Sequence, residues 1–115
     1  MRVLLDDGID EMLGDALTGH KCTTAADMGL GGLPIEALRE KIGESQEAWD
    51  AFITFHHGPQ GKRVMPELLT LAIDAAPSSD DDQGTYMPQV AIALETMQPG
   101  EMALIGKDWL RKLEG

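Results

Sequence analysis

A chain of 115 residues, 43% of them hydrophobic, is long enough for one domain with a single core, and we expect residues 1–115 to form that domain. No stretch approaches the roughly 18 consecutive apolar residues of a membrane span, and the N-terminal segment is unlike a signal peptide, so a cytoplasmic protein is expected. Twenty acidic residues against nine Lys and Arg give a net charge of −11, which opposes nonspecific attraction to a polyphosphate backbone.

The chain opens with a short apolar run, Val3 to Leu5, that ends abruptly in Asp6 and Asp7. A run of this kind bounded by Gly8 predicts a strand buried on both faces, which is a central strand. In open α/β sheets, functional groups gather outside the carboxyl ends of the strands, so the two carboxylates are candidates for a metal or substrate site. The alternative is that an aspartate here only caps the following helix.

The next segment predicts a helix and a second strand. Apolar residues at Ile9, Met12, Leu13, Ala16 and Leu17 have the spacing of a helix that lies on a sheet. Gly19 is expected to cap the C-terminus of this helix, and the Thr-rich segment from residue 21 to 25 predicts a short strand. Its Cys22, the single cysteine, is expected to be a small buried apolar residue. The glycine-dense loop over residues 27–33 has neither P-loop nor dinucleotide-binding spacing.

Pro34 is well placed to begin a helix that runs to about Ile42, with Glu36 and Glu40 one turn apart. These carboxylates either point toward the functional edge of the sheet or form the solvated side of the helix. Residues 49–55 then predict a second buried central strand, which ends in His56 and His57. A histidine beside carboxylates can bind a transition metal or act as a general base, although most such histidines are ordinary loop residues.

The C-terminal half predicts one more βα unit and a tail. Residues 68–73 are apolar enough for a strand, but Pro66 and Glu67 in front of them can equally start a helix. An acidic loop over residues 74–84 precedes a helix at 88–97 and a closing strand at 101–105. Residues 107–113 predict a short amphipathic tail whose Trp109, Leu110 and Leu113 pack either on the core or on another subunit. A homodimer is expected, because a small acidic domain with an exposed Trp has a candidate surface for it. The alternation of strands and helices predicts an α/β fold with a mostly parallel central sheet.

The negative charge restricts how the protein can bind nucleic acid. Binding RNA would require divalent cations, a basic partner protein or a local basic patch. The candidates for such a patch are Lys62 and Arg63 together with the C-terminal residues Lys107, Arg111 and Lys112. The alternative is an acidic surface that only keeps the protein soluble.

The order of motifs resembles that of the small prokaryotic PIN-like proteins related to the Mut7-C group. The resemblance is carried by the opening Arg-Val-Leu-Leu-Asp-Asp-Gly, the Met-Gly-Leu-Gly-Gly-Leu loop, the segment Asp-Ala-Phe-Ile-Thr and the closing Gln-Pro-Gly-Glu-Met-Ala-Leu-Ile. It covers nearly the whole chain, although its individual motifs are short.

The resemblance implies a three-layer α/β/α PIN-like sandwich and the activity of a toxin-type ribonuclease from a toxin–antitoxin pair. Its expected partners are an RNA substrate and a basic antitoxin-like protein. In PIN nucleases, carboxylates hold Mg²⁺ or Mn²⁺ ions that activate water and stabilise the leaving oxygen. The resemblance matches Asp6 to the first metal-binding aspartate, with Asp7 beside it, and makes Glu36 and Glu40 weaker candidates for the helix acid.

The chain departs from the family after the third strand, where Thr-x-Asp is expected and Thr54-Phe55-His56 occurs. An imidazole is a poor ligand for Mg²⁺ but an acceptable one for Mn²⁺ or Zn²⁺. Three hypotheses therefore stay open. The protein is a metal-dependent ribonuclease that uses Asp6 and His56, a noncatalytic interaction module, or a small-ligand binder with an apolar pocket near Phe55.

Overall fold

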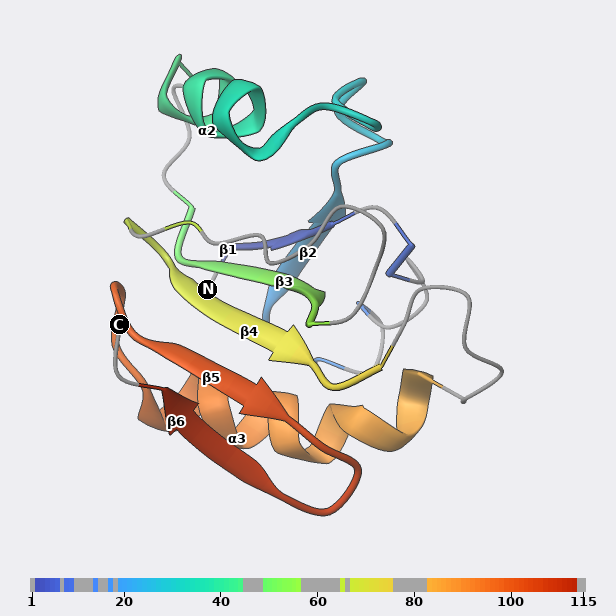
Figure 1. Cartoon of the computed structure of the whole chain (residues 1–115), viewed down its shortest axis with the longest axis vertical. Helices are drawn as coiled ribbons and strands as arrows, with labels where there is room; N and C mark the ends of the chain where they lie inside the picture. The colour runs from blue at the N-terminus through green and yellow to red at the C-terminus, as the bar shows by residue number, and fades with distance from the viewer. Residues whose placement is uncertain are drawn as a thin grey trace.

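The computed structural model describes residues 2–6, 8–9, 14, 17, 19–44, 49–56, 65, 67–75 and 83–113. Within these ranges the chain is an α/β protein with one six-stranded sheet, two α-helices and a short 3₁₀ helix (Figure 1). The strands are β1 (Arg2–Leu5), β2 (Lys21–Thr24), β3 (Ala51–Phe55), β4 (Leu69–Ile73), β5 (Met102–Ile105) and β6 (Leu110–Leu113). The helices are α2 (Ile35–Glu44), η1 (Gln83–Tyr86) and α3 (Met87–Thr96).

The strands lie in the order β2-β1-β3-β4-β5-β6. The first five are parallel to one another and β6 is antiparallel to β5, so the prediction of a mostly parallel sheet is confirmed. The chain passes from β1 outward to β2 and then back across β1 to β3. The direction in which strands are added therefore reverses between β1 and β3, and in open parallel sheets this switch point is where ligands bind.

The strand sequences reflect how deeply each strand is buried. All five residues of β3 and of β4 are buried, as expected for apolar strands in the middle of a sheet with both faces covered. This settles the open choice for residues 68–73, of which residues 69–73 form a strand. The two edge strands, β2 and β6, are more exposed and carry the polar residues that an edge tolerates.

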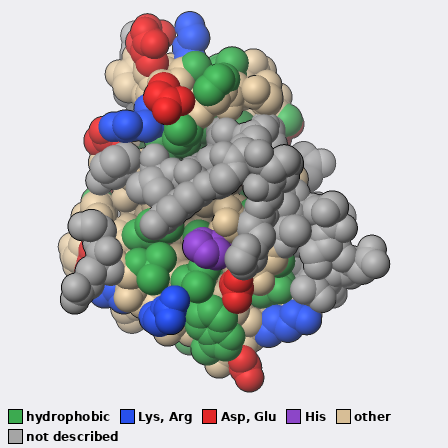
Figure 2. Space-filling model, viewed as in Figure 1, with side chains coloured by type: hydrophobic (Ala, Val, Ile, Leu, Met, Phe, Trp, Pro, Cys, Tyr) green, Lys and Arg blue, Asp and Glu red, His purple; other side chains and the backbone are tan. Residues whose placement is uncertain are grey.

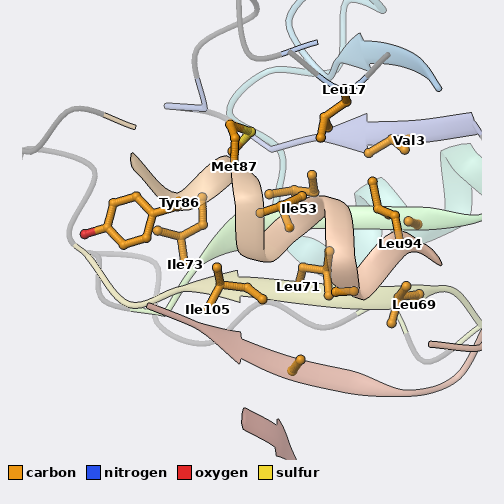
Figure 3. Packing of buried hydrophobic residues seen from close by; sticks show 14 of the residues in the cluster. Val3, Leu17, Ile53, Leu69, Leu71, Ile73, Tyr86, Met87, Leu94 and Ile105 are labelled. Atoms are coloured by element: carbon orange, nitrogen blue, oxygen red, sulfur yellow. The ribbon is translucent and has the colours of Figure 1, made fainter. Parts of the chain in front are cut away.

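Two hydrophobic clusters lie on opposite faces of the sheet, because successive strand residues point in opposite directions. On one face, Ile53 and Leu71 pack with Leu94 of α3 (Figure 3). The same cluster holds Val90 of α3. On the other face, the α2 residue Leu38 packs in a cluster that holds Leu4, Phe52 and Trp49. Each helix therefore covers a different face of the sheet.

The helix boundaries follow the residues that favour them. Helix α2 begins one residue after Pro34, whose carbonyl accepts a hydrogen bond from the Leu38 amide at 2.9 Å. Helix α3 has a proline in its first turn, which is compatible with a helix start because that amide has no intrahelical partner. The chain leaves α3 at Met97, which is extended, and turns at Gly100, where φ is 90°.

The C-terminal tail differs from the amphipathic tail expected from sequence, because part of it forms the edge strand β6. Leu110 lies opposite Ile105 and Leu113 lies opposite Met102. These two leucines pack against clusters on opposite faces of the sheet. The tail therefore completes the core of this chain.

The helix predicted over residues 9–17 falls mostly outside the described residues, and so does most of the acidic loop at 74–84. Within the described ranges, no helix is both long enough and apolar enough to cross a bilayer.

Candidate functional site

The first candidate site lies at the carboxyl ends of β1 and β3, the two strands that flank the switch point. Asp6 directly follows β1, and its main-chain amide donates a 2.9 Å hydrogen bond to the Ile53 carbonyl in β3. Since Leu5 is in register with Ile53, Asp6 lies level with Thr54. The sequence-based prediction that Asp6 lies at the end of a central strand is confirmed.

The Asp6 carboxylate is buried, with 4% of the residue exposed. Its Oδ2 atom accepts a hydrogen bond from the Thr54 hydroxyl at 2.6 Å, and Thr54 is only 1% exposed. A carboxylate needs such donors, because burying a charged group away from water is costly unless hydrogen bonds compensate. The structure therefore holds the Asp6 carboxyl group in a fixed position at the switch point.

Two further backbone contacts fix the chain around Asp6. Its carbonyl accepts the Ile9 amide at 3.1 Å, which closes a turn immediately after β1. On the side toward β2, the Ala25 amide donates to the Leu5 carbonyl at 2.9 Å. The aspartate thus sits between two ordered strand ends, which favours a preorganised site.

His56 is the first residue after β3 and is half-buried. Its amide donates a 2.8 Å hydrogen bond to the Ile73 carbonyl at the end of β4. His56 therefore lies two residues beyond Thr54 along the same chain, at the edge of the sheet where Asp6 is found. Its neighbour His57 lies outside the described residues, as does Asp7.

Glu36 and Glu40, the other predicted metal ligands, are both exposed on α2. Within the described part of the chain, no three His, Cys, Asp or Glu side chains come close enough together to hold a metal ion. The described residues thus offer one buried carboxylate and one imidazole at the switch point. Donors of these two kinds together suit Mn²⁺ better than Mg²⁺, which prefers oxygen ligands.

A cavity of about 280 Å³ lies further along the same edge of the sheet. It is lined by Asp74, Tyr86, Gly106, Lys107, Asp108 and Trp109. Sequence reasoning predicted a ligand pocket near Phe55 and did not find this one. The only signal for it was an isolated tryptophan in a polar segment, because the lining residues come from three separate parts of the chain.

The basic patch considered from the sequence is only partly described. Lys62 and Arg63 lie outside the described residues, and Lys112 forms an ion pair with Glu101. On the face of the molecule seen in Figure 2, the coloured acidic and basic side chains are intermixed. Mixed charge of this kind does not by itself offer an extended phosphate-binding surface.

Cys22 carries a free thiol that is half-buried. Burial raises the pKa of its thiol above the ordinary value, so the protonated form predominates at neutral pH. The side chain packs, half-buried, against the core cluster on the α3 face. The prediction of a small buried apolar residue is confirmed in part, because Cys22 packs against the core but is only half-buried.

Comparisons of the chain with protein-family models, with curated proteins and with solved structures find no match.

Proposed function

We propose that the protein is a three-layer α/β/α PIN-like domain and a divalent-metal-dependent endoribonuclease of the toxin–antitoxin type. The observation that carries the proposal is the buried Asp6 carboxylate, held by Thr54 at the switch point of a mostly parallel sheet. A buried, oriented carboxylate at this place is what a metal-dependent hydrolase requires of its first ligand. The two hydrophobic clusters on opposite faces of the sheet support the three-layer arrangement.

Asp6 and His56 would hold the metal, with Asp7 as a further carboxylate. Glu36 and Glu40, the weaker candidates, are exposed on α2 and form no metal-binding group with Asp6 and His56 among the described residues. Because one of the two principal ligands is an imidazole, Mn²⁺ is the expected ion and Mg²⁺ the weaker binder. A bound ion activates water and stabilises charge on the leaving oxygen of a phosphodiester. It would also offset part of the repulsion between RNA and a protein whose net charge is −11.

The first test is thermal unfolding of the full chain in EDTA, Mg²⁺, Mn²⁺ and Zn²⁺. An ion at 100 times its dissociation constant stabilises the native state by about 2.7 kcal/mol. We expect Mn²⁺ to raise the melting temperature of the wild type and to have no such effect on Asp6→Asn or His56→Ala. Asp6→Asn keeps an acceptor for the Thr54 hydroxyl, which makes it safer for folding than Asp6→Ala.

An acidic protein also binds divalent cations nonspecifically, so a matched control is needed. Glu95 is exposed on α3 and belongs to no candidate site. Glu95→Gln removes the same charge as Asp6→Asn, and its response to Mn²⁺ should equal that of the wild type. If the Mn²⁺-dependent rise in melting temperature falls by the same small amount in Asp6→Asn, His56→Ala and Glu95→Gln, the ion is only a surface counterion. That result would disprove the metal site.

Cleavage of single-stranded RNA in the stabilising ion is the second test. Activity should disappear in Asp6→Asn and persist in Glu95→Gln. Cleavage that survives in purified Asp6→Asn would show that the activity comes from another residue or from a contaminant.

A second candidate function, a noncatalytic interaction module, is favoured by a different observation. His56 stands where a second carboxylate would be needed, and Glu36 and Glu40 are exposed on α2. Such a module would bind a basic antitoxin-like segment through its acidic surface, and it would show neither metal stabilisation nor cleavage. The expected homodimer stays a prediction under either function, and sedimentation equilibrium tests it directly.

A further inference from the structure

Strand β6 forms one edge of the sheet (Figure 1). Among the described residues its only neighbouring strand is β5, to which it is antiparallel. In an antiparallel pair, every second residue directs both its N–H and its C=O toward the neighbouring strand, and the residues between them direct both groups away. An edge strand therefore offers half of its main-chain groups to a further strand.

The register identifies the residues of β6 that point outward. The Ile105 carbonyl accepts a 2.8 Å hydrogen bond from the Asp74 amide, on the β4 side of β5. The main chain of Ile105 therefore faces away from β6, and that of its partner Leu110 faces away from β5. Two residues further on, Lys112 also points outward, whereas Arg111 between them pairs with β5. The N–H and C=O groups of Leu110 and Lys112 thus form the open edge.

The Arg111 side chain is exposed on the face of the sheet opposite α3. Its partner in β5 is Leu104, and Leu104 and Leu113 belong to the small hydrophobic cluster on that face. Within the described part of the chain, Arg111 forms no ion pair. An ion pair is stronger beside apolar side chains than in bulk water, so this position favours an acidic ligand.

The neighbouring lysines are already engaged. Lys112 forms an ion pair with Glu101, and Lys107 takes part in an interaction within the chain. Lysine on an edge strand normally opposes the addition of a further strand, but Glu101 neutralises Lys112 here. One available guanidinium in this strand is too little for a polyphosphate backbone, which the net charge of −11 also repels. A single carboxylate in an extended peptide is the better match.

Trp109 extends the apolar part of this surface. The Gly106 amide donates to the Trp109 carbonyl at 2.8 Å, which closes the turn between β5 and β6. The indole packs so closely over Gly106 that a Cβ atom at that position would collide with ring atoms. Trp109 is nevertheless 40% exposed. An ordered aromatic side chain therefore lies two residues before Arg111, beside the open edge.

We propose that β6 binds an extended peptide segment of another protein as an added antiparallel strand, with an acidic residue opposite Arg111. The main-chain groups of Leu110 and Lys112 supply the hydrogen bonds, which give such complexes their affinity. Peptide residues two positions before and after the acidic residue share its face and meet Trp109 and Leu113, so both are apolar. The partner segment therefore has the pattern apolar-x-acidic-x-apolar.

A second copy of this chain is a poorer occupant of the edge. Two β6 strands pair only through their outward residues, so full overlap sets Leu110 of one copy opposite Lys112 of the other. That register places the two Arg111 side chains directly opposite each other in a non-hydrogen-bonded pair, where side chains are closest. Like charges in this position are destabilising. The expected homodimer would therefore use another surface.

The test uses the full chain and the peptide acetyl-Ser-Val-Thr-Glu-Thr-Val-Ser-amide, with amide hydrogen exchange followed by NMR. Without peptide, the Leu110 and Lys112 amides should exchange fast and the Arg111 amide slowly. At 90% occupancy the peptide should slow the two outward amides about tenfold, because only the free protein exchanges there. The Trp109 indole signal should shift, and that of Trp49, which is 7% exposed in the α2-face cluster, should not.

N-methylated peptides separate strand pairing from other modes of binding. The amides of the two peptide threonines face Leu110 and Lys112, so methylating them should abolish binding. The amide of the peptide glutamate points away from β6, so methylating it should leave the affinity nearly unchanged. These controls need no protein variant and are therefore independent of effects on folding.

Charge exchange tests the pairing with Arg111. Replacing the peptide glutamate by glutamine should weaken binding about 1.5- to 5-fold, the usual range for a cross-strand ion pair. Arg111→Glu should prefer the peptide with lysine in place of glutamate, which reverses the preference of the wild type. Arg39→Glu makes the same charge change on the exposed side of α2 and should keep the wild-type preference.

Several results would overturn the proposal. One is an unchanged exchange rate of the Leu110 and Lys112 amides with peptide, and others are equal binding of the two kinds of methylated peptide or an unreversed preference in Arg111→Glu. Outward amides that are protected without peptide and lose protection on dilution would assign the edge to a second copy. Displacement of the peptide by oligouridylate would assign the surface to RNA.

Discussion

The hydrogen bond between Thr54 and Asp6 should make a measurable contribution to stability, which Thr54→Val isolates. Valine has nearly the shape of threonine, so the substitution removes the hydroxyl and leaves the packing largely intact. The bond is 2.6 Å long, and both residues are buried, at 1% and 4% exposure. Hydrogen bonds to charged groups contribute about 1.5–3 kcal/mol, and we expect a loss of that size.

The assay is equilibrium unfolding in urea, carried out on the wild type, Thr54→Val, Asp6→Ala and the double variant. With a denaturant slope of about 1–3 kcal/mol per molar urea, a loss of 2 kcal/mol moves the midpoint by roughly 1 M. The double-mutant cycle removes effects that either substitution has alone. We expect a coupling free energy of about 1.5–3 kcal/mol between the two positions.

A coupling free energy below about 0.5 kcal/mol would refute this reasoning. It would mean that water or other groups replace the Thr54 hydroxyl at no cost, and that the Asp6 carboxylate is not held rigidly. The support for a preorganised first metal ligand would then be lost, although the fold would be unaffected.

Three further predictions concern other parts of the molecule. Gly106→Ala places a methyl group where the Trp109 indole lies. The fluorescence emission of the tryptophans should therefore shift, and the free energy of unfolding should fall by about 1–3 kcal/mol. Unchanged emission would mean that the indole does not pack over Gly106. Leu38→Ala removes the fully buried anchor of α2 and should cost about 2–5 kcal/mol in urea unfolding, so a cost below 1 kcal/mol would contradict the packing of this helix. The hydrogen bond from Lys112 holds the pKa of Glu101 below its ordinary value. The pair therefore stabilises the folded state at pH values above the pKa that Glu101 has in the unfolded chain. This stabilisation is lost as the pH falls through the pKa of Glu101 in the folded state. Glu101→Gln should therefore show a smaller decrease in melting temperature than the wild type in that acidic interval, and an identical pH profile would show that the exposed pair contributes nothing.

The sequence by itself determined the central strands and the place of Asp6. In an apolar run such as Val3 to Leu5, successive side chains point to opposite faces of the strand, so all of them are buried only when both faces are covered. A central position in the sheet therefore follows from the composition of the run. The abrupt change from Leu5 to Asp6 marks the end of that strand because an aspartate in mid-sheet would bury an unsatisfied charge. The same change from apolar to polar residues predicted β3 and its end before His56.

Patterns that fit two structures were resolved only by tertiary contacts. Leu110 and Leu113 are three residues apart, a spacing that suits one face of a helix. In the structure they lie on opposite faces of the edge strand β6, where each covers a different part of the core. Pairing with β5 decides this, because an isolated four-residue strand has no stability of its own.

The arrangement of the candidate sites was also decided by the tertiary structure. Thr54 is 48 residues from Asp6 in the chain, and only the parallel register of β1 and β3 brings its hydroxyl to the carboxylate. Asp74 and Trp109 meet in one cavity only because β4 and β5 end side by side. Local sequence determines which segments can form strands, whereas strand order and register determine which strand ends are neighbours, and therefore which side chains meet.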